Sequence, residues 1–161
     1  MENTYIFGTV LGNIKIIESN NFITNIQFID EKDVNTVETD VTPFPEENLL
    51  LIQAATQLQE FLSGSRKQFD LPLNLIGTEF QKNVWTILQT IPYGEHWSYK
   101  QVAIAIGKPT AARAVGMANN KNPIPIIVPC HRVIGANGDL VGYAGGLVIK
   151  EHLLKLEKGE L

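Results

Sequence analysis

Apolar and polar positions alternate along the first 30 residues. The segments "YIFGTVLG", "IKIIES" and "FITNIQFID" carry their apolar residues in alternation or in short groups, which is typical of β-strands. Gly12-Asn13 and Ser19-Asn20-Asn21 separate these segments and are typical turn residues. The pattern therefore predicts an antiparallel meander of about three strands.

The spacing of apolar residues changes after an acidic, proline-containing loop at residues 31–47. Intervals of three and four predict a helix that carries Leu50, Leu51, Ala54, Leu58, Phe61 and Leu62 on one face. Ser63-Gly64-Ser65 ends this helix. Because no side chain in this half suggests catalysis, residues 1–76 are predicted to be a structural α+β domain.

The second half, residues 77–161, is predicted to be mostly helical and to follow a linker at residues 69–80. Thr78 can cap a helix that stops at Pro92, since its hydroxyl can accept a hydrogen bond from the first turn. A last helix is predicted within "GGLVIKEHLLKLEKG", residues 145–159.

Two short helices between these elements form a helix-turn-helix pattern. Ser98 and Thr110 are the predicted N-caps, and Gly107-Lys108-Pro109 is the turn. The second helix begins with Ala111, Ala112 and Ala114 around Arg113. Small side chains allow close approach to DNA and read few base edges, which favours shape-sensitive contact in the minor groove. The alternative is a helix packed in the core through its alanines, with Arg113 in solvent.

Composition and charge narrow the class of protein. With 44% hydrophobic and 19% charged residues, the chain has the composition of a globular protein. We expect no membrane span and no signal peptide, and hence a cytoplasmic protein. Residues 1–95 carry 13 acidic and 5 basic side chains, whereas residues 96–161 carry 4 acidic and 8 basic ones. From His96 to Gly138 there are five Lys or Arg and no Asp or Glu, which indicates either a solvated basic face or a surface for a polyanion.

Cys130 is the only cysteine in the chain. It excludes an internal disulfide, and the spacing of the three histidines does not match a metal site, so we expect no metal. A lone cysteine in a β-branched segment is commonly a buried structural residue. The alternative is a nucleophile, because His131 follows directly and can take the thiol proton. Glu151, near the start of the last helix, is the candidate carboxylate that orients His131.

Several motifs occur together in one order: "PYGEHWSYKQVA", "AARAVGMANNKNP", "IPIIVPCHRV", "YAGGL" and "KEHLL". Over about residues 77–158 the chain resembles the O6-alkylguanine-DNA alkyltransferases, also called methylated-DNA–protein-cysteine methyltransferases. Residues 1–76 resemble this family in length and element order only. The resemblance implies an α+β fold with a small antiparallel-sheet, ribonuclease-H-like N-terminal domain. It implies a mostly helical C-terminal domain with a winged-helix-like helix-turn-helix.

The resemblance also implies a reaction. A damaged guanine in double-stranded DNA is extruded from the stack, and Cys130 takes the alkyl group from its O6 atom. O4-alkylthymine is implied as a second substrate. No cofactor is needed and the protein acts as a monomer. Since no second thiol can remove the resulting thioether, each molecule reacts once.

The family's site residues carry over to this sequence by motif. Arg113 would enter the stack, and Tyr99 would rotate the nucleotide and then hydrogen-bond or protonate the departing guanine. His131, through a water, and Glu151 would relay the proton from Cys130. Further DNA contacts would come from Thr110, Ala111, Ala112 and Ala114. The substrate pocket would comprise Asn122, Val133, Tyr143, Ala144 and Gly145, with Asn122 holding the turn that precedes Cys130.

Two departures from the family pattern and three rival functions accompany this interpretation. Some relatives carry Ser at the position of Ala144, and relatives in animals bind zinc through N-terminal cysteines that this chain lacks. A cysteine hydrolase would need a histidine from a distant segment. A non-catalytic alkyltransferase-like damage binder would lack Cys130. A helix-turn-helix regulator would need more base-reading side chains than "AARAVG" offers.

Overall fold

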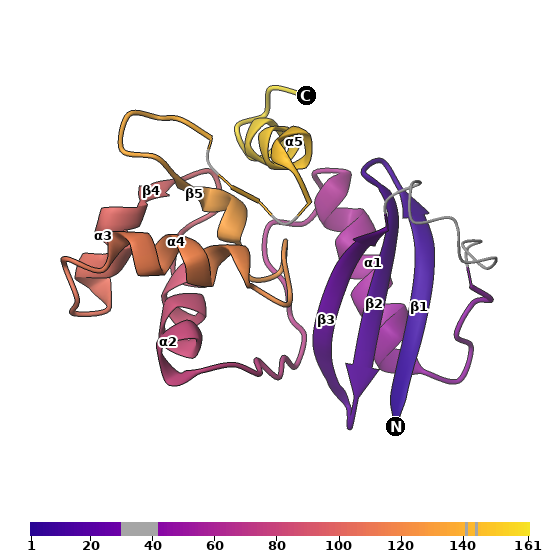
Figure 1. Cartoon of the computed structure of the whole chain (residues 1–161). Coiled ribbons are helices and arrows are strands. Elements are labelled where there is room, and N and C mark those ends of the chain that lie inside the picture. The colour runs from indigo at the N-terminus through magenta and orange to yellow at the C-terminus, as the bar shows by residue number, and fades with distance from the viewer. Residues whose placement is uncertain (30–41, 141, 144) are drawn as a thin grey trace. The chain divides into compact units, whose positions relative to one another are not determined.

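The chain forms two compact units, Met1–Asn74 and Leu75–Leu161, in a computed structural model (Figure 1). The structure describes residues 1–29, 42–140, 142–143 and 145–161. Most of the predicted acidic loop therefore lies outside the described residues. The predicted boundary after residue 76 falls two residues beyond the division between the units, and the separate roles assigned to the two segments stay a prediction.

The first unit contains the predicted three-stranded meander. Strands β1 (Glu2–Thr9), β2 (Gly12–Ser19) and β3 (Phe22–Ile29) pair antiparallel in the order β1-β2-β3. Apolar side chains on one face of the sheet form its core: Phe7, Ile14, Ile16, Ile23 and Ile26 are buried. The fold class inferred from the alternation is therefore confirmed for this half.

The sequence predicted the position of the second hairpin turn correctly, but not that of the first. Asn20 and Asn21 have φ angles of 53° and 66°, as in the type I′ turns that match the twist of a hairpin. The first turn does not lie at Gly12-Asn13, because these residues already pair with Thr9 and Gly8. It lies two residues earlier, where the Thr9 hydroxyl donates to the Gly12 carbonyl at 2.7 Å and accepts from the Leu11 amide.

Helix α1 (Leu49–Leu62) lies against one face of this sheet (Figure 1). It begins at Asn48, whose side chain accepts a hydrogen bond from the Leu51 amide. Its buried apolar residues are Leu51, Ala54, Ala55, Leu58, Phe61 and Leu62. Five of the six residues predicted for this face are in the set; Leu50 is half-buried, and Ala55, which was not predicted, is buried.

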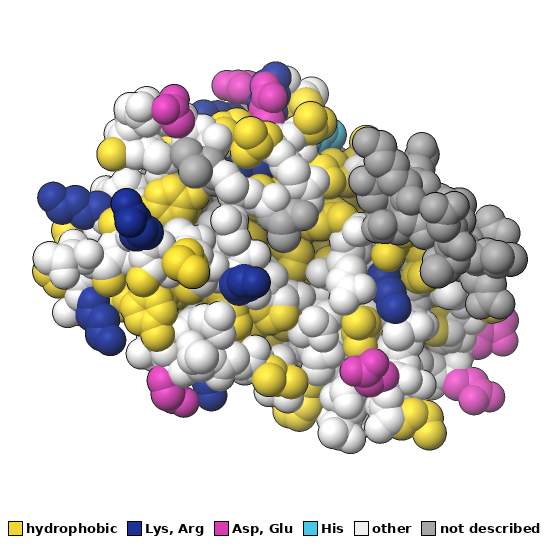
Figure 2. Space-filling model, in the orientation of Figure 1, with side chains coloured by type: hydrophobic (Ala, Val, Ile, Leu, Met, Phe, Trp, Pro, Cys, Tyr) yellow, Lys and Arg dark blue, Asp and Glu magenta, His cyan; other side chains and the backbone are white. Residues whose placement is uncertain are grey.

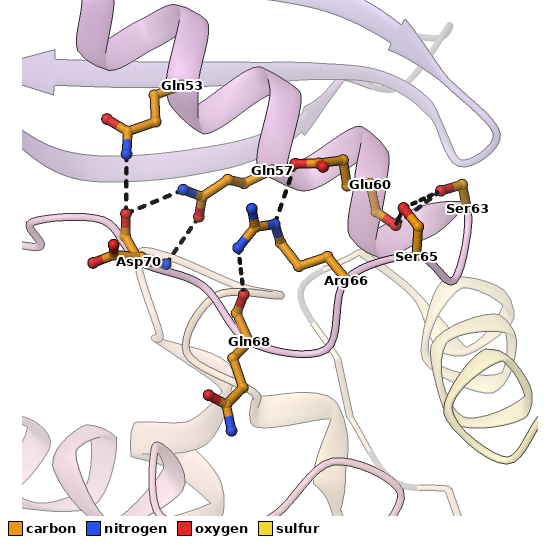
Figure 3. A network of polar contacts seen from close by, with 8 residues as sticks. All are labelled: Gln53, Gln57, Glu60, Ser63, Ser65, Arg66, Gln68 and Asp70. Carbon is orange, nitrogen blue, oxygen red and sulfur yellow. Dashed lines mark hydrogen bonds and ion pairs between the residues drawn. The ribbon is translucent and has the colours of Figure 1, made fainter.

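Polar side chains of α1 hold the irregular segment that follows it (Figure 3). The Gln57 amide donates to the Asp70 carbonyl at 3.1 Å and accepts from the Asp70 amide at 2.9 Å, while Gln53 donates to the same carbonyl. Arg66 forms an ion pair with Glu60 at 3.2 Å. These polar side chains of the first unit thus stabilise its own fold.

The second unit begins with two capped helices. Thr78 and Gln81 form a capping box at α2 (Glu79–Leu88), and Ser98 and Gln101 form one at α3 (Tyr99–Ala105). Both predicted N-caps are confirmed. Helix α2 ends at Leu88, four residues before the proline that was expected to stop it.

Helix α4 (Ala112–Asn120) completes the helix-turn-helix, but Thr110 does not cap it. The chain still turns over residues 108–111, where the Ala111 amide donates to the Lys108 carbonyl at 2.9 Å. The helix consequently begins later, with Ala111 as its N-cap and no side-chain hydrogen bond there. Its inner face packs on α2, where the Trp85 indole donates to the Ala118 carbonyl at 2.8 Å.

The remaining elements surround Cys130. A short 3-10 turn, Cys130–Arg132, leads into β5 (Val133–Ile134), which pairs parallel with β4 (Trp97–Ser98). No pattern in the sequence predicted this two-residue ladder. Helix α5 (Leu147–Glu157), which the sequence did predict, packs on the 3-10 turn. Among the described residues, the helices are too short or too polar to cross a membrane.

Candidate active site

The segment before Cys130 is fixed by the side chain of Asn122. Asn122 donates to the Val128 carbonyl at 2.8 Å and accepts from the Ile124 amide at 2.9 Å, so one buried amide closes the loop. Within this loop Ile126 has a φ of 73°, an unfavourable backbone conformation for a β-branched residue. The amide of Cys130 then donates to the Val128 carbonyl at 2.8 Å. The loop therefore presents Cys130 in one defined position.

The Cys130 thiol is buried, with 2% of the residue exposed. Burial raises its pKa to about 11, against the opposing effects of a hydrogen bond from Asn122 and the charge of Lys150. The resting group at neutral pH is consequently a thiol. A base must remove its proton before the sulfur can act as a nucleophile.

His131 contacts a carboxylate, but it is Glu157 and not Glu151. The His131 Nε2 and Glu157 Oε2 atoms are 2.6 Å apart, and both side chains are buried. Glu151 is exposed and forms an ion pair with Lys155 at 3.0 Å. The prediction that Glu151 orients His131 is therefore wrong in its residue. The physical reason is the rotation of α5: Lys150, Leu153 and Glu157 face inward, and Glu151 lies on another side of the helix.

Arg132 holds the same carboxylate from its other side. Its guanidinium donates to both Glu157 oxygens at 2.9 to 3.1 Å and to the Ile91 carbonyl at 2.7 Å. The Gly94 amide also donates to Glu157, at 3.0 Å. Burial alone would raise the pKa of Glu157, but the hydrogen bonds of His131 and Arg132, the charge of Arg132 and the charge of His131 in its protonated form lower it to about 2. Glu157 is thus a fixed carboxylate at neutral pH.

His131 itself is neutral at rest. Burial lowers its pKa below the ordinary value, and the Glu157 carboxylate opposes this effect. With its Nε2–H donated to Glu157, the neutral imidazole has Nδ1 as its acceptor. A neutral histidine held by a carboxylate is the arrangement that removes a proton from a nucleophile.

Lys150 is a buried cation that the sequence analysis did not single out. Its Nζ donates to the Val133 carbonyl at 2.6 Å, and the residue is completely buried. Burial lowers its pKa to about 8, although the charge of ionised Cys130 would raise it. The available sequence signal was helical spacing, since Lys150 lies three residues before the buried Leu153.

Asn119 joins helix α4 to the nucleophile. Its Nδ2 donates to the Cys130 carbonyl at 3.3 Å from the last turn of the helix. Its Oδ1 is buried and has no hydrogen-bond partner among the described residues. The sequence offered little to find this residue, because an asparagine near a helix end is usually read as a cap or a turn.

The remaining predicted pocket residues lie near Cys130 to different degrees. Tyr99 and Tyr143 both have a pKa raised by burial first and by the charge of Cys130 second, which places both phenols within electrostatic reach of the sulfur. Val133 is buried in β5, and Gly145 is partly exposed. Ala144 lies outside the described residues.

The predicted DNA contacts near Arg113 lie in the turn before α4 and in its first turn. Arg113, Ala114 and Thr110 are exposed, and Ala111 and Ala112 are half-buried. A hollow of about 440 Å³ is lined there by Tyr99, Ala112, Arg113, Gly116, Met117 and Asn120. In Figure 2, dark blue Lys and Arg atoms stand among yellow hydrophobic atoms over α3 and α4.

No cluster of three or more His, Cys, Asp or Glu side chains suited to a metal ion occurs in the part of the chain that the structure describes. The expectation of a metal-free site stays a prediction. The chemistry available at Cys130 is that of a thiol, an imidazole, a carboxylate, the buried phenol of Tyr143 and the half-buried phenol of Tyr99. This set serves nucleophilic attack with proton transfer.

Comparison with known proteins identifies relatives of both units. The family model described as "6-O-methylguanine DNA methyltransferase, DNA binding domain" matches residues 79–159. The model described as the ribonuclease-like domain of the same methyltransferase matches residues 4–75. Both predicted domain types therefore have a counterpart in one family.

Individual relatives agree with this match. The methylated-DNA–protein-cysteine methyltransferase of Methanosarcina barkeri is 61% identical over 109 residues, covering 68% of this chain and 69% of that protein. The constitutive enzyme of Bacillus subtilis is 48% identical over 151 residues, covering 93% and 92%. The crystal structure of Mycobacterium tuberculosis OGT in complex with DNA matches with a TM-score of 0.83 and 44% identity, covering 96% of this chain and 92% of that one.

Proposed function

The chain belongs to the family of 6-O-methylguanine DNA methyltransferases, and we propose that it repairs DNA by moving an alkyl group from guanine O6 to Cys130. The observation that carries the proposal is the buried Cys130 thiol beside the His131–Glu157 pair, within a domain that matches the family's DNA-binding domain. In the reaction the bond between O6 and the alkyl carbon breaks. A bond between that carbon and the Cys130 sulfur forms.

The proton of Cys130 leaves through His131. Because the thiol has a pKa of about 11, attack at neutral pH requires a base. Neutral His131 takes the proton through a water, and the ionised Glu157 stabilises the imidazolium that forms. Lys150 adds positive charge near the developing thiolate. Tyr99 hydrogen-bonds the departing guanine or donates a proton to it. The proton that His131 took then returns through water, so the net change moves one proton from the thiol to guanine.

The nucleotide must leave the base stack before it reaches Cys130, because O6 takes part in base pairing. Arg113 enters the vacated position, where its planar guanidinium stacks and hydrogen-bonds. Tyr99 rotates the nucleotide outward. The small residues Ala111, Ala112 and Ala114, together with Thr110, allow α4 to approach the minor groove closely. Asn122, Val133, Tyr143, Ala144 and Gly145 surround the extruded base.

The thioether product limits each molecule to a single turnover. The thioether on Cys130 has no route of removal, since the chain holds no second thiol. Each molecule therefore reacts once. The proposal also includes that the protein acts as a monomer and without a cofactor. O4-alkylthymine is a second substrate, and the reaction takes place in the cytoplasm, where thiols stay reduced.

Mass spectrometry tests this function directly. After mixing with duplex DNA that contains O6-methylguanine, we expect one methyl group per chain, on the peptide that carries Cys130. Binding to the damaged duplex without an adduct would instead identify a non-catalytic damage binder. An adduct on another residue would exclude Cys130 as the acceptor.

A further inference from the structure

Met117 is a large apolar side chain that lies exposed on α4. The residue is 66% exposed and lines the same hollow as Arg113 and Tyr99. On the opposite side of the helix, Val115 and Ala118 are buried. The inner apolar face of helix α4 therefore packs in the core. The outer apolar residue, Met117, does not contribute to core packing.

Helix geometry places Met117 directly beyond Arg113. Residues four apart lie on one face of a helix, about 6 Å apart along its axis. Gly116 lies beside them, and a Cβ built there would be 3.7 Å from the Tyr99 ring. Gly116 lines the same hollow and has no side chain to stand between Arg113 and Met117, so a partner that meets Arg113 there also meets Met117.

The surrounding charge selects the chemistry of that partner. Lys100, Lys108, Arg113 and Lys121 are exposed, and the sequence from His96 to Gly138 holds no Asp or Glu. Arg113 is the one charged residue among those that line the hollow. A partner that fits must offer phosphates to the cations and C–H surface to the thioether. The minor groove of duplex DNA offers both, as sugar and base edges between two phosphate backbones.

We propose that Met117 packs against the sugars and base edges of duplex DNA, one helical turn along α4 from Arg113. The identity of the partner rests on the proposed function. Nucleotides follow one another at about 3.4 Å along a strand, so Met117 reaches one or two nucleotides beyond the one that Arg113 replaces. A thioether adapts to such an irregular surface because it is unbranched and flexible. This contact adds affinity without displacing counterions.

The salt dependence of DNA binding separates this contact from those of the cations. The dissociation constant for an undamaged duplex is measured over a series of salt concentrations for the wild type, Met117→Ala and Met117→Leu. We expect Met117→Ala to raise Kd roughly 5- to 20-fold at every salt concentration with an unchanged slope, since the lost contact is apolar. Met117→Leu keeps the apolar contact and should stay within about threefold of the wild type.

Two control variants calibrate the measurement. Lys121→Ala removes an exposed cation and should reduce the salt slope by about one. Val148→Ala alters an apolar residue of α5 that is 82% exposed, and should change Kd by less than about twofold. Thermal unfolding checks each variant, and Met117→Gln replaces Met117→Ala if the alanine variant does not fold.

The proposal is overturned if Met117→Ala behaves like Val148→Ala, if it changes the salt slope, or if Met117→Leu is as weak as Met117→Ala. Methyl transfer from a duplex that contains O6-methylguanine to the wild-type Cys130 tests the proposed function separately. Without that adduct the proposed function fails, and the comparison of Kd values still decides the role of Met117.

Discussion

The surroundings of Cys130 and the outer face of α4 differ in the burial of their functional side chains. At Cys130 the ionisable side chains are buried and partnered: His131 and Arg132 both hold Glu157 at 3.1 Å or less. On α4, Arg113 and Met117 are exposed and line an open hollow. One region has its charges arranged before any substrate arrives. The other completes its contacts when DNA binds.

This difference decides what a mutation measures. A substitution in the buried network changes the protein itself, because it leaves a charge without a partner in a region of low dielectric. A substitution of an exposed residue on the outer face of α4, such as Arg113 or Met117, leaves the free protein largely intact and acts when a duplex is present. The comparison of a duplex substrate with a free base is therefore the experiment that separates the two regions.

Cys130→Ser should have the largest effect. A serine hydroxyl has no accessible anion at neutral pH and is a far weaker nucleophile than a thiol. We expect no alkyl adduct by mass spectrometry, while the affinity for duplex DNA survives because α3 and α4 are unchanged. Stoichiometric methylation of this variant would refute the role of Cys130.

Glu157→Gln should slow transfer by roughly 100- to 10,000-fold at neutral pH, the range of a general base. The glutamine cannot stabilise the imidazolium of His131, so the thiol must ionise unaided. The deficit should shrink as pH rises toward the Cys130 pKa of about 11. Rates with free O6-benzylguanine between neutral and alkaline pH provide the measurement. A deficit that does not change with pH would show that Glu157 acts through the fold alone.

The same carboxylate should control stability in acid. The pKa of Glu157 falls from 4.5 to about 2 on folding, so its stabilisation is complete above pH 4.5 and disappears as pH falls through about 2. This shift corresponds to about 3 kcal/mol at 1.36 kcal/mol per pKa unit. Denaturant unfolding across this range should show a loss of stability in the wild type that Glu157→Gln lacks. Parallel pH profiles for the two proteins would contradict the assignment.

Arg113→Ala should slow transfer from duplex DNA but not transfer from a free base. Flipping a nucleotide costs a few kcal/mol, and in the proposed function Arg113 offsets part of this cost by entering the stack. We expect transfer from duplex DNA to slow by roughly ten- to a thousandfold, about 1.4 to 4 kcal/mol, while transfer from free O6-benzylguanine changes less than about threefold. Equal losses on both substrates would mean that Arg113 supports the fold or the pocket.

Local sequence rules found most elements because their signals are local. Thr78 and Ser98 begin helices with capping boxes. Asn20 and Asn21 form a type I′ turn, which requires two residues in the left-handed backbone conformation. Thr110 failed as a cap because the preceding turn runs one residue further than its composition suggests. The two-residue ladder of β4 and β5 was missed because it joins residues 36 apart, and no local pattern encodes such a pairing.

The chemistry of Cys130 was predicted in its nucleophile and its histidine, but not in its carboxylate. Glu151 was the candidate because it lies near the start of the last helix, whereas the rotation of α5 brings Glu157 to His131. Leu153 is buried, and counting four residues onward from it gives Glu157. The sequence therefore contained the signal, in the apolar face of the helix. The backbone carbonyls of Ile91 and Val133, which accept hydrogen bonds from Arg132 and Lys150, are brought there by tertiary packing and had no comparable signal.

Glu151→Gln should have the smallest effect of all and is the matched control for Glu157→Gln. The two residues lie on one helix and the substitution is chemically identical. Glu151 is exposed and pairs with Lys155 across one turn of the helix, a contact worth about 0.3 to 0.5 kcal/mol. We expect the rate of transfer and its pH profile to stay within about twofold of the wild type. A pH-dependent loss like that of Glu157→Gln would mean that α5 rotates when substrate binds and brings Glu151 to His131. The fixed, buried network at Cys130 would then be no more preorganised than the surface of α4.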